Sequence, residues 1–99
     1  VVLGSGRSRR EAEQKAATVR EQAQKLAETV RREGNERADS LVARASNPLA
    51  KAAARAAADR LRKEANDKAD GIVREADKRA NDMIEEAKKK AAAIGTNRT

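Results

Sequence analysis

The chain contains no cysteine, no histidine and no aromatic residue. Without Cys it can form no disulfide and carry out no thiol chemistry, and its redox compartment cannot be inferred. Its four serines, Ser5, Ser8, Ser40 and Ser46, have no His that could activate them as nucleophiles. We therefore expect no catalytic residues, no enzymatic activity and no cofactor.

Long apolar runs and promising metal ligands are also missing. The most apolar stretch lies around Leu49 to Ala58, and Lys51 and Arg55 interrupt it, so it is far too short to span a membrane. Glu85 and Glu86 are adjacent acids, which point about 100° apart on a helix and chelate a cation poorly. We expect neither a metal site nor membrane insertion by this segment.

Alanine and charged residues dominate what is present. Charged residues make up 39% of the chain and apolar residues 38%, a composition typical of long helices and coiled coils. With 99 residues and no aromatic ring, the chain can form one small domain with a thin core. It begins at Val1 without a methionine, which favours a piece of a longer protein or a processed product.

Apolar residues recur with a period of eleven in both halves of the sequence. Lys63-Glu64-Ala65, for example, is followed eleven residues later by Arg74-Glu75-Ala76 and then by Glu85-Glu86-Ala87. Eleven residues over three turns is about 3.67 per turn, so the apolar stripe runs almost straight along a helix, with a slight right-handed drift. The predicted helix-packing seam consists of Ala12, Ala16, Val19, Ala23, Ala27, Val30, Gly34, Ala38, Leu41, Leu61, Ala65, Ala69, Ile72, Ala76, Ala80, Met83 and Ala87.

Capping signals set the expected helix boundaries. Ser8 and Glu11 form a capping box, Asn47-Pro48 suits a helix start, and Gly95 suits a left-handed C-cap. We expect a flexible tail or the end of a preceding element over 1–7, helix one over 8–45, a turn over 46–48, helix two over 48–94 and a frayed tail over 95–99.

The sequence therefore predicts an all-α fold of two long helices joined at Asn47-Pro48, with Ala-rich, right-handed or straight coiled-coil packing. An antiparallel hairpin is the preferred geometry, and one long helix kinked at Pro48 is the alternative. In the hairpin register that the turn sets, small residues face larger ones, which indicates interdigitating packing. The expected facing pairs are Val19–Ala76, Ala23–Ile72, Val30–Ala65, Gly34–Leu61, Val42–Ala53 and Ala12–Met83.

Many acids precede a base by four residues, the favourable order for ion pairs on one helix. Predicted pairs include Glu11–Lys15, Glu33–Arg37, Asp59–Lys63, Glu64–Lys68, Asp70–Arg74, Glu85–Lys89 and Glu86–Lys90. The net charge of +7 suggests contact with nucleic acid or another polyanion as an alternative. The unneutralised bases that would serve it are Arg7, Arg9, Arg10, Lys88, Lys89 and Lys90, but no aromatic side chain is present for base stacking.

The Lys/Arg-Glu-Ala motif, followed by Ala four residues on and by Ile or Val, resembles the eleven-residue repeats of rotary ATPase peripheral-stalk subunits. Together with Asn47 to Lys51 it is also similar to Ala/Lys/Glu helical tails of envelope proteins from bacteria of the Bacteroides group. The repeats look like those of late-embryogenesis-abundant proteins as well. These resemblances imply, respectively, a helical stalk, an appendage in a bacterial envelope and a disordered desiccation protectant.

The seam favours a structural or assembly module that packs on itself or on another helical protein, as an appendage of a larger bacterial protein. An electrostatic polyanion binder is the alternative from another class, and a disordered protectant is the third. No small-molecule substrate is expected.

Overall fold

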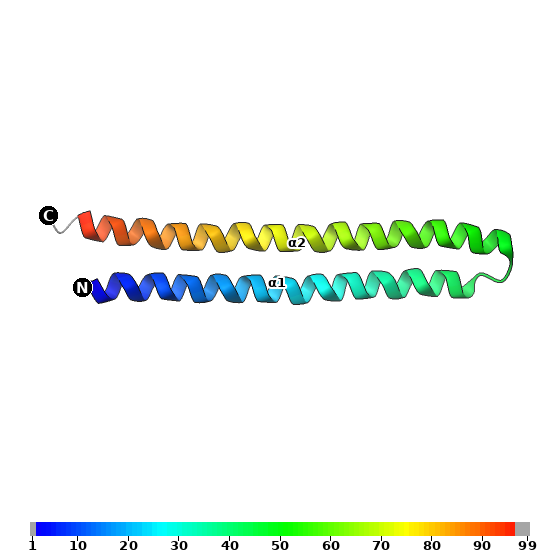
Figure 1. Ribbon diagram of the computed structural model, residues 1–99, viewed down its shortest axis with the longest axis horizontal. Coiled ribbons are helices and arrows are strands. Elements are labelled where there is room, and N and C mark those ends of the chain that lie inside the picture. Colours follow the sequence, from blue (N-terminus) through cyan, green and yellow to red (C-terminus); the bar gives the residue numbers. More distant parts are fainter. Residues whose placement is uncertain (1, 97–99) are drawn as a thin grey trace. The chain divides into compact units, whose positions relative to one another are not determined.

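The computed structural model describes the backbone of residues 2–96 and the side chains of residues 9–93. Two α-helices make up this part of the chain, α1 (Val2–Arg44) and α2 (Pro48–Thr96), as Figure 1 shows. Ala45, Ser46 and Asn47 connect them. The predicted all-α fold of two long helices joined at Asn47-Pro48 is confirmed.

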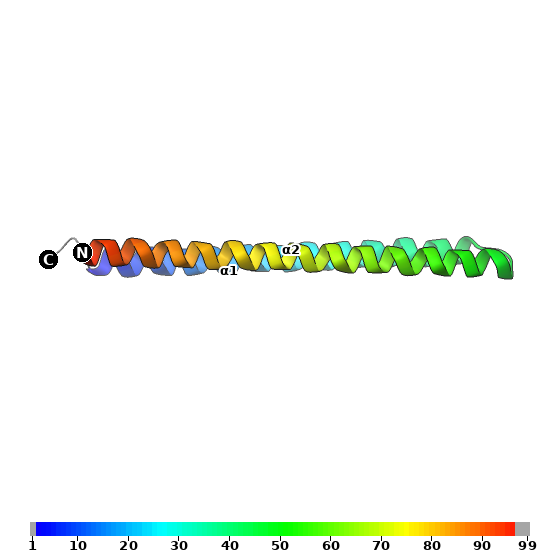
Figure 2. The same cartoon turned by 90° about the horizontal axis from the view of Figure 1, so that it is seen from above.

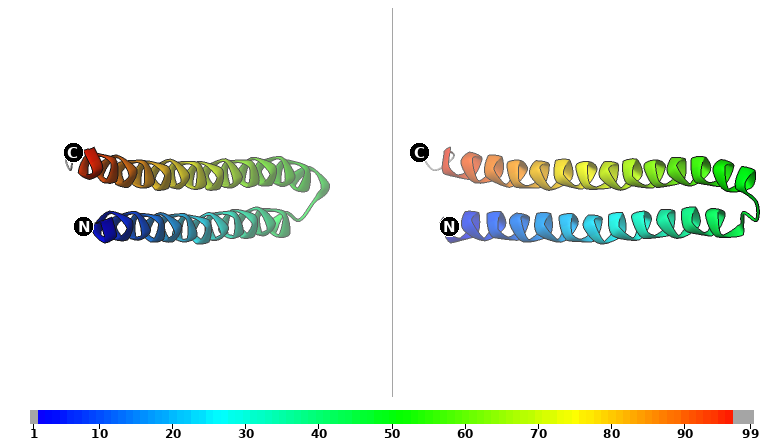
Figure 3. Two further views of the ribbon diagram at one scale, coloured as in Figure 1. Left: turned by 60° about the vertical axis from the view of Figure 1, so that its left-hand side comes forward. Right: turned by 45° about the vertical axis from the view of Figure 1, so that its right-hand side comes forward.

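The helices contribute to two compact units. Unit 1 combines Val1–Ala23 with Arg74–Thr99, and unit 2 is Gln24–Val73. Within unit 2, α1 and α2 run antiparallel on the two sides of the turn (Figures 1 and 3). Within unit 1, the beginning of α1 lies antiparallel to the end of α2, and the two segments overlap when seen from above (Figure 2). The fold is therefore the antiparallel helical hairpin, and the alternative of a single kinked helix is wrong.

The chain reversal uses the residues that the sequence indicated. The side-chain oxygen of Asn47 accepts a hydrogen bond from the backbone N–H of Ala50 at 2.8 Å, as an N-cap should. The Asn47 carbonyl accepts from the N–H of Lys51 at 2.8 Å, the first bond of α2. Pro48 occupies the first helical position, where its missing N–H costs nothing. Asn47-Pro48 thus starts α2 and ends the connection.

The outer helix boundaries differ from the prediction. The helix α1 begins at Val2, so Ser8 is inside it and does not cap it, and the predicted tail over 1–7 is helical from Val2 onward. At the other end α2 continues through Gly95 to Thr96, and no glycine of the described backbone has a positive φ. Each residue added to an existing helix gains a hydrogen bond, so propagation outweighs these local stop signals. The predicted fraying of 97–99 lies outside the described residues.

Candidate helix-packing surfaces

Alanine forms the core between the helices. Among residues 9–93, every buried side chain is an alanine. The buried positions are spaced by eleven along each helix: Ala16, Ala27 and Ala38 on α1, and Ala58, Ala69 and Ala80 together with Ala76 and Ala87 on α2. Because an alanine methyl removes little surface from water, each contributes only about 0.8 kcal/mol.

The larger side chains of the predicted seam lie at the edges of this core. The structure places the remaining seam residues at intermediate exposure: Ala12, Val19, Ala23, Val30, Gly34, Leu41, Leu61, Ala65, Ile72 and Met83. Leu26, which is not on the predicted seam, is 53% exposed. The chain therefore buries its small apolar groups and leaves its large ones partly in water.

Sequence reasoning missed Ala58, although a signal was available. Ala58 is fully buried and precedes the buried Ala69 by eleven residues. It lies in the Ala-rich stretch after Pro48, where alanines on every side of the helix hide the periodicity. Extending the period backward from Ala69 would have found it.

The two helices of unit 2 approach each other closely at Gly34. A Cβ placed on Gly34 would collide with the Cβ of Ala65, and it would lie 3.6 Å from the carbonyl oxygen of Leu61. The nearest side chain to Gly34 is therefore that of Ala65, one turn beyond the predicted partner Leu61. Cα–Cβ bonds lean toward the N-terminus of each helix, so touching residues in an antiparallel pair lie further along both helices than facing Cα atoms. Here the contact joins two small residues and not a small one with a large one.

Salt bridges between the helices close one side of the seam. In unit 2, Arg31 reaches Asp70 at 2.6 Å and Arg62 reaches Asp39 at 2.7 Å. Each arginine follows a buried alanine by four residues, which places it about 40° from the centre of the seam. We call this side of unit 2, defined by Arg31, Arg62, Asp39 and Asp70, the bridged face.

Unit 1 has a similar cross-link. Arg20, four residues after Ala16, reaches Asp77 at 3.2 Å and donates a hydrogen bond to the side-chain oxygen of Asn81 at 2.6 Å. Arg20 and Arg31 are eleven residues apart, so the seam periodicity could have revealed them. Sequence reasoning missed all three arginines because it looked for ion pairs along one helix only.

Three acids pair with partners other than those predicted. Asp70 pairs with Arg31 across the seam, Asp59 with Arg62 at 3.5 Å, and Glu85 with Lys88 at 3.6 Å. Spacing of four residues makes a contact geometrically available, but for Asp70 and Asp59 an arginine beside the seam competes for the carboxylate. The sequence had predicted Arg74, Lys63 and Lys89 as the partners of Asp70, Asp59 and Glu85, respectively.

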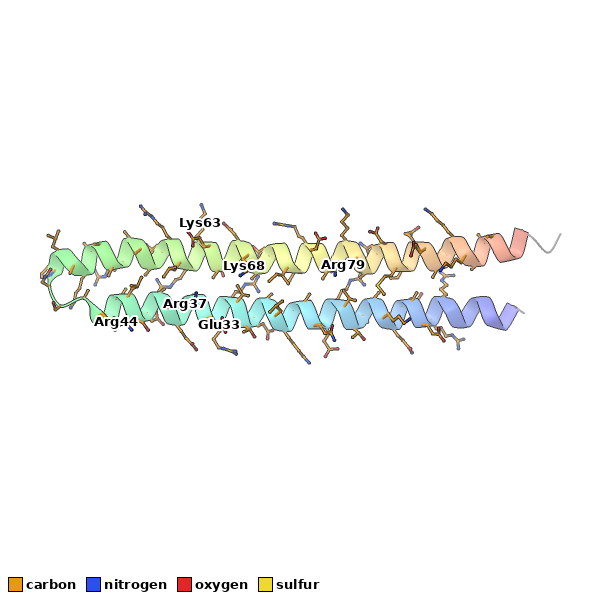
Figure 4. The ribbon with its side chains drawn as sticks, turned by 180° about the vertical axis from the view of Figure 1, so that it is seen from behind. Glu33, Arg37, Arg44, Lys63, Lys68 and Arg79 are labelled. Atoms are coloured by element: carbon orange, nitrogen blue, oxygen red, sulfur yellow. The ribbon has the colours of Figure 1, made fainter. Side chains whose placement is uncertain are left out.

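The other side of the seam in unit 2 is an open groove with a volume of about 500 Å³ near the turn. On this side, a larger apolar residue follows a buried alanine of the seam by three residues. It lies about 60° around the helix from that alanine, in the direction opposite to the arginine that follows the alanine by four residues. Glu33, Arg37 and Lys68 line this groove and are labelled in Figure 4, where Lys63 lies on the outer side of α2. The unit 2 groove is lined by Val30, Glu33, Gly34, Glu36, Arg37, Ser40, Leu41, Arg44, Leu61, Glu64, Ala65 and Lys68.

Unit 1 has a groove of the same chemistry. Its lining comprises Glu11, Ala12, Lys15, Met83, Glu86, Ala87 and Lys90. Ala12 and Met83, a predicted facing pair, thus border one cavity. In both grooves each helix contributes a Glu, a small residue directly after it, and a base three residues further on. The repeated pattern of a Glu followed by a small residue therefore forms the floor and rim of an open surface.

The bases proposed for polyanion contact are spread over several environments. Arg9 pairs with Glu13 at 3.8 Å and Lys88 pairs with Glu85, whereas Lys90 lines the unit 1 groove. Arg10 and Lys89 are exposed, and the side chain of Arg7 lies outside the described residues. Two of the five bases whose side chains are described are thus paired with acids on their own helix.

Neither metal chemistry nor a bilayer crossing finds support in the described part of the chain. Within it, no three acidic side chains gather into a metal-binding group. Its helices also contain no window apolar enough to cross a membrane.

No protein-family model matches the chain, and no significant match to it occurs among the curated proteins or the solved structures. The resemblances of the eleven-residue repeats therefore stay predictions.

Proposed function

We propose that the chain is a structural, non-catalytic helical module that assembles with other helices through its grooves. The observation that carries this proposal is the division of apolar residues: alanines are buried, whereas Val30, Leu41 and Leu61 border an open groove. Covering such a surface removes large apolar side chains from water, which lowers the free energy of the assembled form.

The spacing of the buried alanines supports straight or slightly right-handed coiled-coil packing in the assembled form. Small residues at the seam let helices approach closely, so further helices can extend the same packing. The thinness of the core supports a need for a partner, because alanine burial alone offsets little of the entropy lost on ordering two long helices.

The test compares two leucine sites with an uncharged apolar dye such as Nile red, which the basic side chains of the chain do not attract electrostatically. We expect the dilute chain to bind the dye, the variant Leu41→Gln/Leu61→Gln to lose most of that binding, and Leu49→Gln to retain it. Leu49 is a suitable control because it is 82% exposed and outside the grooves. A dilute chain that is fully helical, monomeric and unable to bind the dye would contradict the proposal.

A salt series distinguishes this function from polyanion binding. Contacts to phosphates release counterions, so a polyanion binder loses affinity steeply as salt rises. Packing through Val30, Leu41 and Leu61 should change little, because burial of apolar surface does not depend on counterion release.

A further inference from the structure

The groove linings are electrically neutral although the chain is strongly basic. The unit 2 groove has three acids, Glu33, Glu36 and Glu64, and three bases, Arg37, Arg44 and Lys68. The unit 1 groove has two acids and two bases. The net charge of +7 is therefore carried elsewhere. A lining without net charge gives a polyanion no net electrostatic attraction, and it suits a partner with the same mixture of charges.

Most charged side chains of these linings form no salt bridge with another described residue. Glu33–Arg37 and Glu64–Lys68 were predicted as ion pairs on one helix, but among the described residues none of these four side chains forms a salt bridge. The same holds for Glu11, Lys15, Glu86 and Lys90. Arg37, Lys68 and Lys15 each directly precede a buried alanine, so each lies about 100° around the helix from the seam and cannot reach across it. These groups are available to a second surface.

The charged groove residues of α1 and α2 are aligned in the same register as the salt-bridged residues of the bridged face. In unit 2, Arg31 pairs with Asp70 and Asp39 with Arg62. Glu33 lies two residues after Arg31, and Lys68 lies two residues before Asp70. Arg37 lies two residues before Asp39, and Glu64 two residues after Arg62. An α1 and an α2 aligned as within the chain would therefore place Glu33 level with Lys68 and Arg37 level with Glu64.

Unit 1 repeats this correspondence independently. Its register is given by the hydrogen bond from Arg20 to Asn81. Lys15 lies five residues before Arg20 and Glu86 five residues after Asn81, while Glu11 and Lys90 lie nine residues away on the same two sides. Four groove acids are thus level with a base on the other helix: Glu11, Glu33, Glu64 and Glu86.

We propose that the groove face of each unit binds the same face of a second copy of this chain, with α1 of one copy antiparallel to α2 of the other. This inference rests on the proposed packing function and names its partner. In unit 2, Glu33 then pairs with the second copy's Lys68, and Arg37 pairs with the second copy's Glu64. A two-fold axis along the helices repeats both contacts, as an isologous interface requires. The covered groove places Val30, Leu41 and Leu61 inside a four-helix layer.

Charge reversal on one helix at a time tests the register. Variant A carries Glu33→Arg/Arg37→Glu, and variant B carries Glu64→Lys/Lys68→Glu. Each variant turns four attractive contacts of the dimer into four repulsive ones without changing the net charge. The control Glu28→Arg/Arg32→Glu makes the same reversal on exposed residues outside the grooves.

Sedimentation equilibrium at low ionic strength measures the outcome. We expect a dimer for the chain and for the control, and dissociation constants raised roughly tenfold or more for A alone and for B alone. An equimolar mixture of A and B should restore the dimer, because both of its seams again join opposite charges. Selective A–B association would establish the register.

Two results would overturn the inference. A dimer that A, B and the control leave equally stable would mean that copies associate through another surface. A chain that stays monomeric at every concentration would exclude a second copy as the partner. If that monomer still binds the apolar dye through Leu41 and Leu61, the proposed packing function survives with a different helical partner. A monomer that binds no dye contradicts both proposals.

Discussion

In unit 2, Arg31 and Arg62 reach acids on the opposite helix, whereas Arg37 and Lys68, on the other side of the same seam, reach none within the described part of the chain. The two pairs of bases have similar chemistry and differ in their angular position around the helix, measured from the buried alanines. A base four residues after a buried alanine lies about 40° from the seam, and a base directly before one lies about 100° from it. This angle decides whether a charge closes the hairpin or faces outward at the groove.

The apolar residues differ in the same way. On the groove side, three residues after a buried alanine, stand Val30, Leu41 and Leu61. On the bridged side the corresponding positions hold the two arginines, whose guanidinium groups cover the seam. One face of unit 2 is thus closed by the chain itself, and the other is an open groove that, in the proposed assembly, a second surface covers.

The largest effect is expected at the groove floor. Gly34→Leu should destabilise the chain by about 1–3 kcal/mol, because the added Cβ would collide with the Cβ of Ala65. Gly71→Leu is the matched control: nothing lies within 4 Å of its added Cβ, so better helix propensity should make it neutral or stabilising by up to about 1 kcal/mol. Urea unfolding measures both. Equal effects at the two glycines would refute the close approach at Gly34.

A direct comparison of the two faces uses the neighbours Leu61 and Arg62. If copies associate as proposed, Leu61→Ala should cost about 1–2 kcal/mol in concentrated protein, where a second copy would cover the groove, and less in dilute protein. Arg62→Ala should cost less than about 1 kcal/mol at both concentrations, because its bridges to Asp39 and Asp59 are solvent-exposed. Thermal unfolding at two protein concentrations provides the measurement. A concentration-independent cost at Leu61 would show that the groove stays open.

The next effect concerns the turn that sets the register of both faces. Asn47→Ala removes the acceptor for the Ala50 N–H and should cost about 1 kcal/mol. Asn47→Asp retains an acceptor oxygen at that site and serves as the control. Denaturant unfolding of the three proteins would show whether the cap is used. Equal stability of Asn47→Ala and the parent chain would argue against it.

The sequence was sufficient for the repeating parts of this structure. The eleven-residue period placed all seventeen predicted seam residues at buried or half-buried positions, and Asn47-Pro48 located the turn. It failed at the helix ends, where Ser8 and Gly95 are local signals that helix propagation outweighs. It also failed to place Arg31 and Arg62, because contacts between helices depend on side-chain direction as well as on spacing.

The smallest effect separates the two faces most cleanly. A double-mutant cycle on Arg31→Gln and Asp70→Asn should give a coupling of about 0.2–1 kcal/mol, since both side chains are more than one third exposed. This coupling arises within one chain, so it should not depend on protein concentration, and high salt should weaken it. The corresponding cycle on Arg37→Gln and Glu64→Gln should give no coupling in dilute monomer and a coupling of similar size once copies associate. Both cycles can be followed by chemical unfolding at two protein concentrations. Coupling between Arg37 and Glu64 in the monomer would mean that the chain itself closes the groove face, and the distinction between the two faces would disappear.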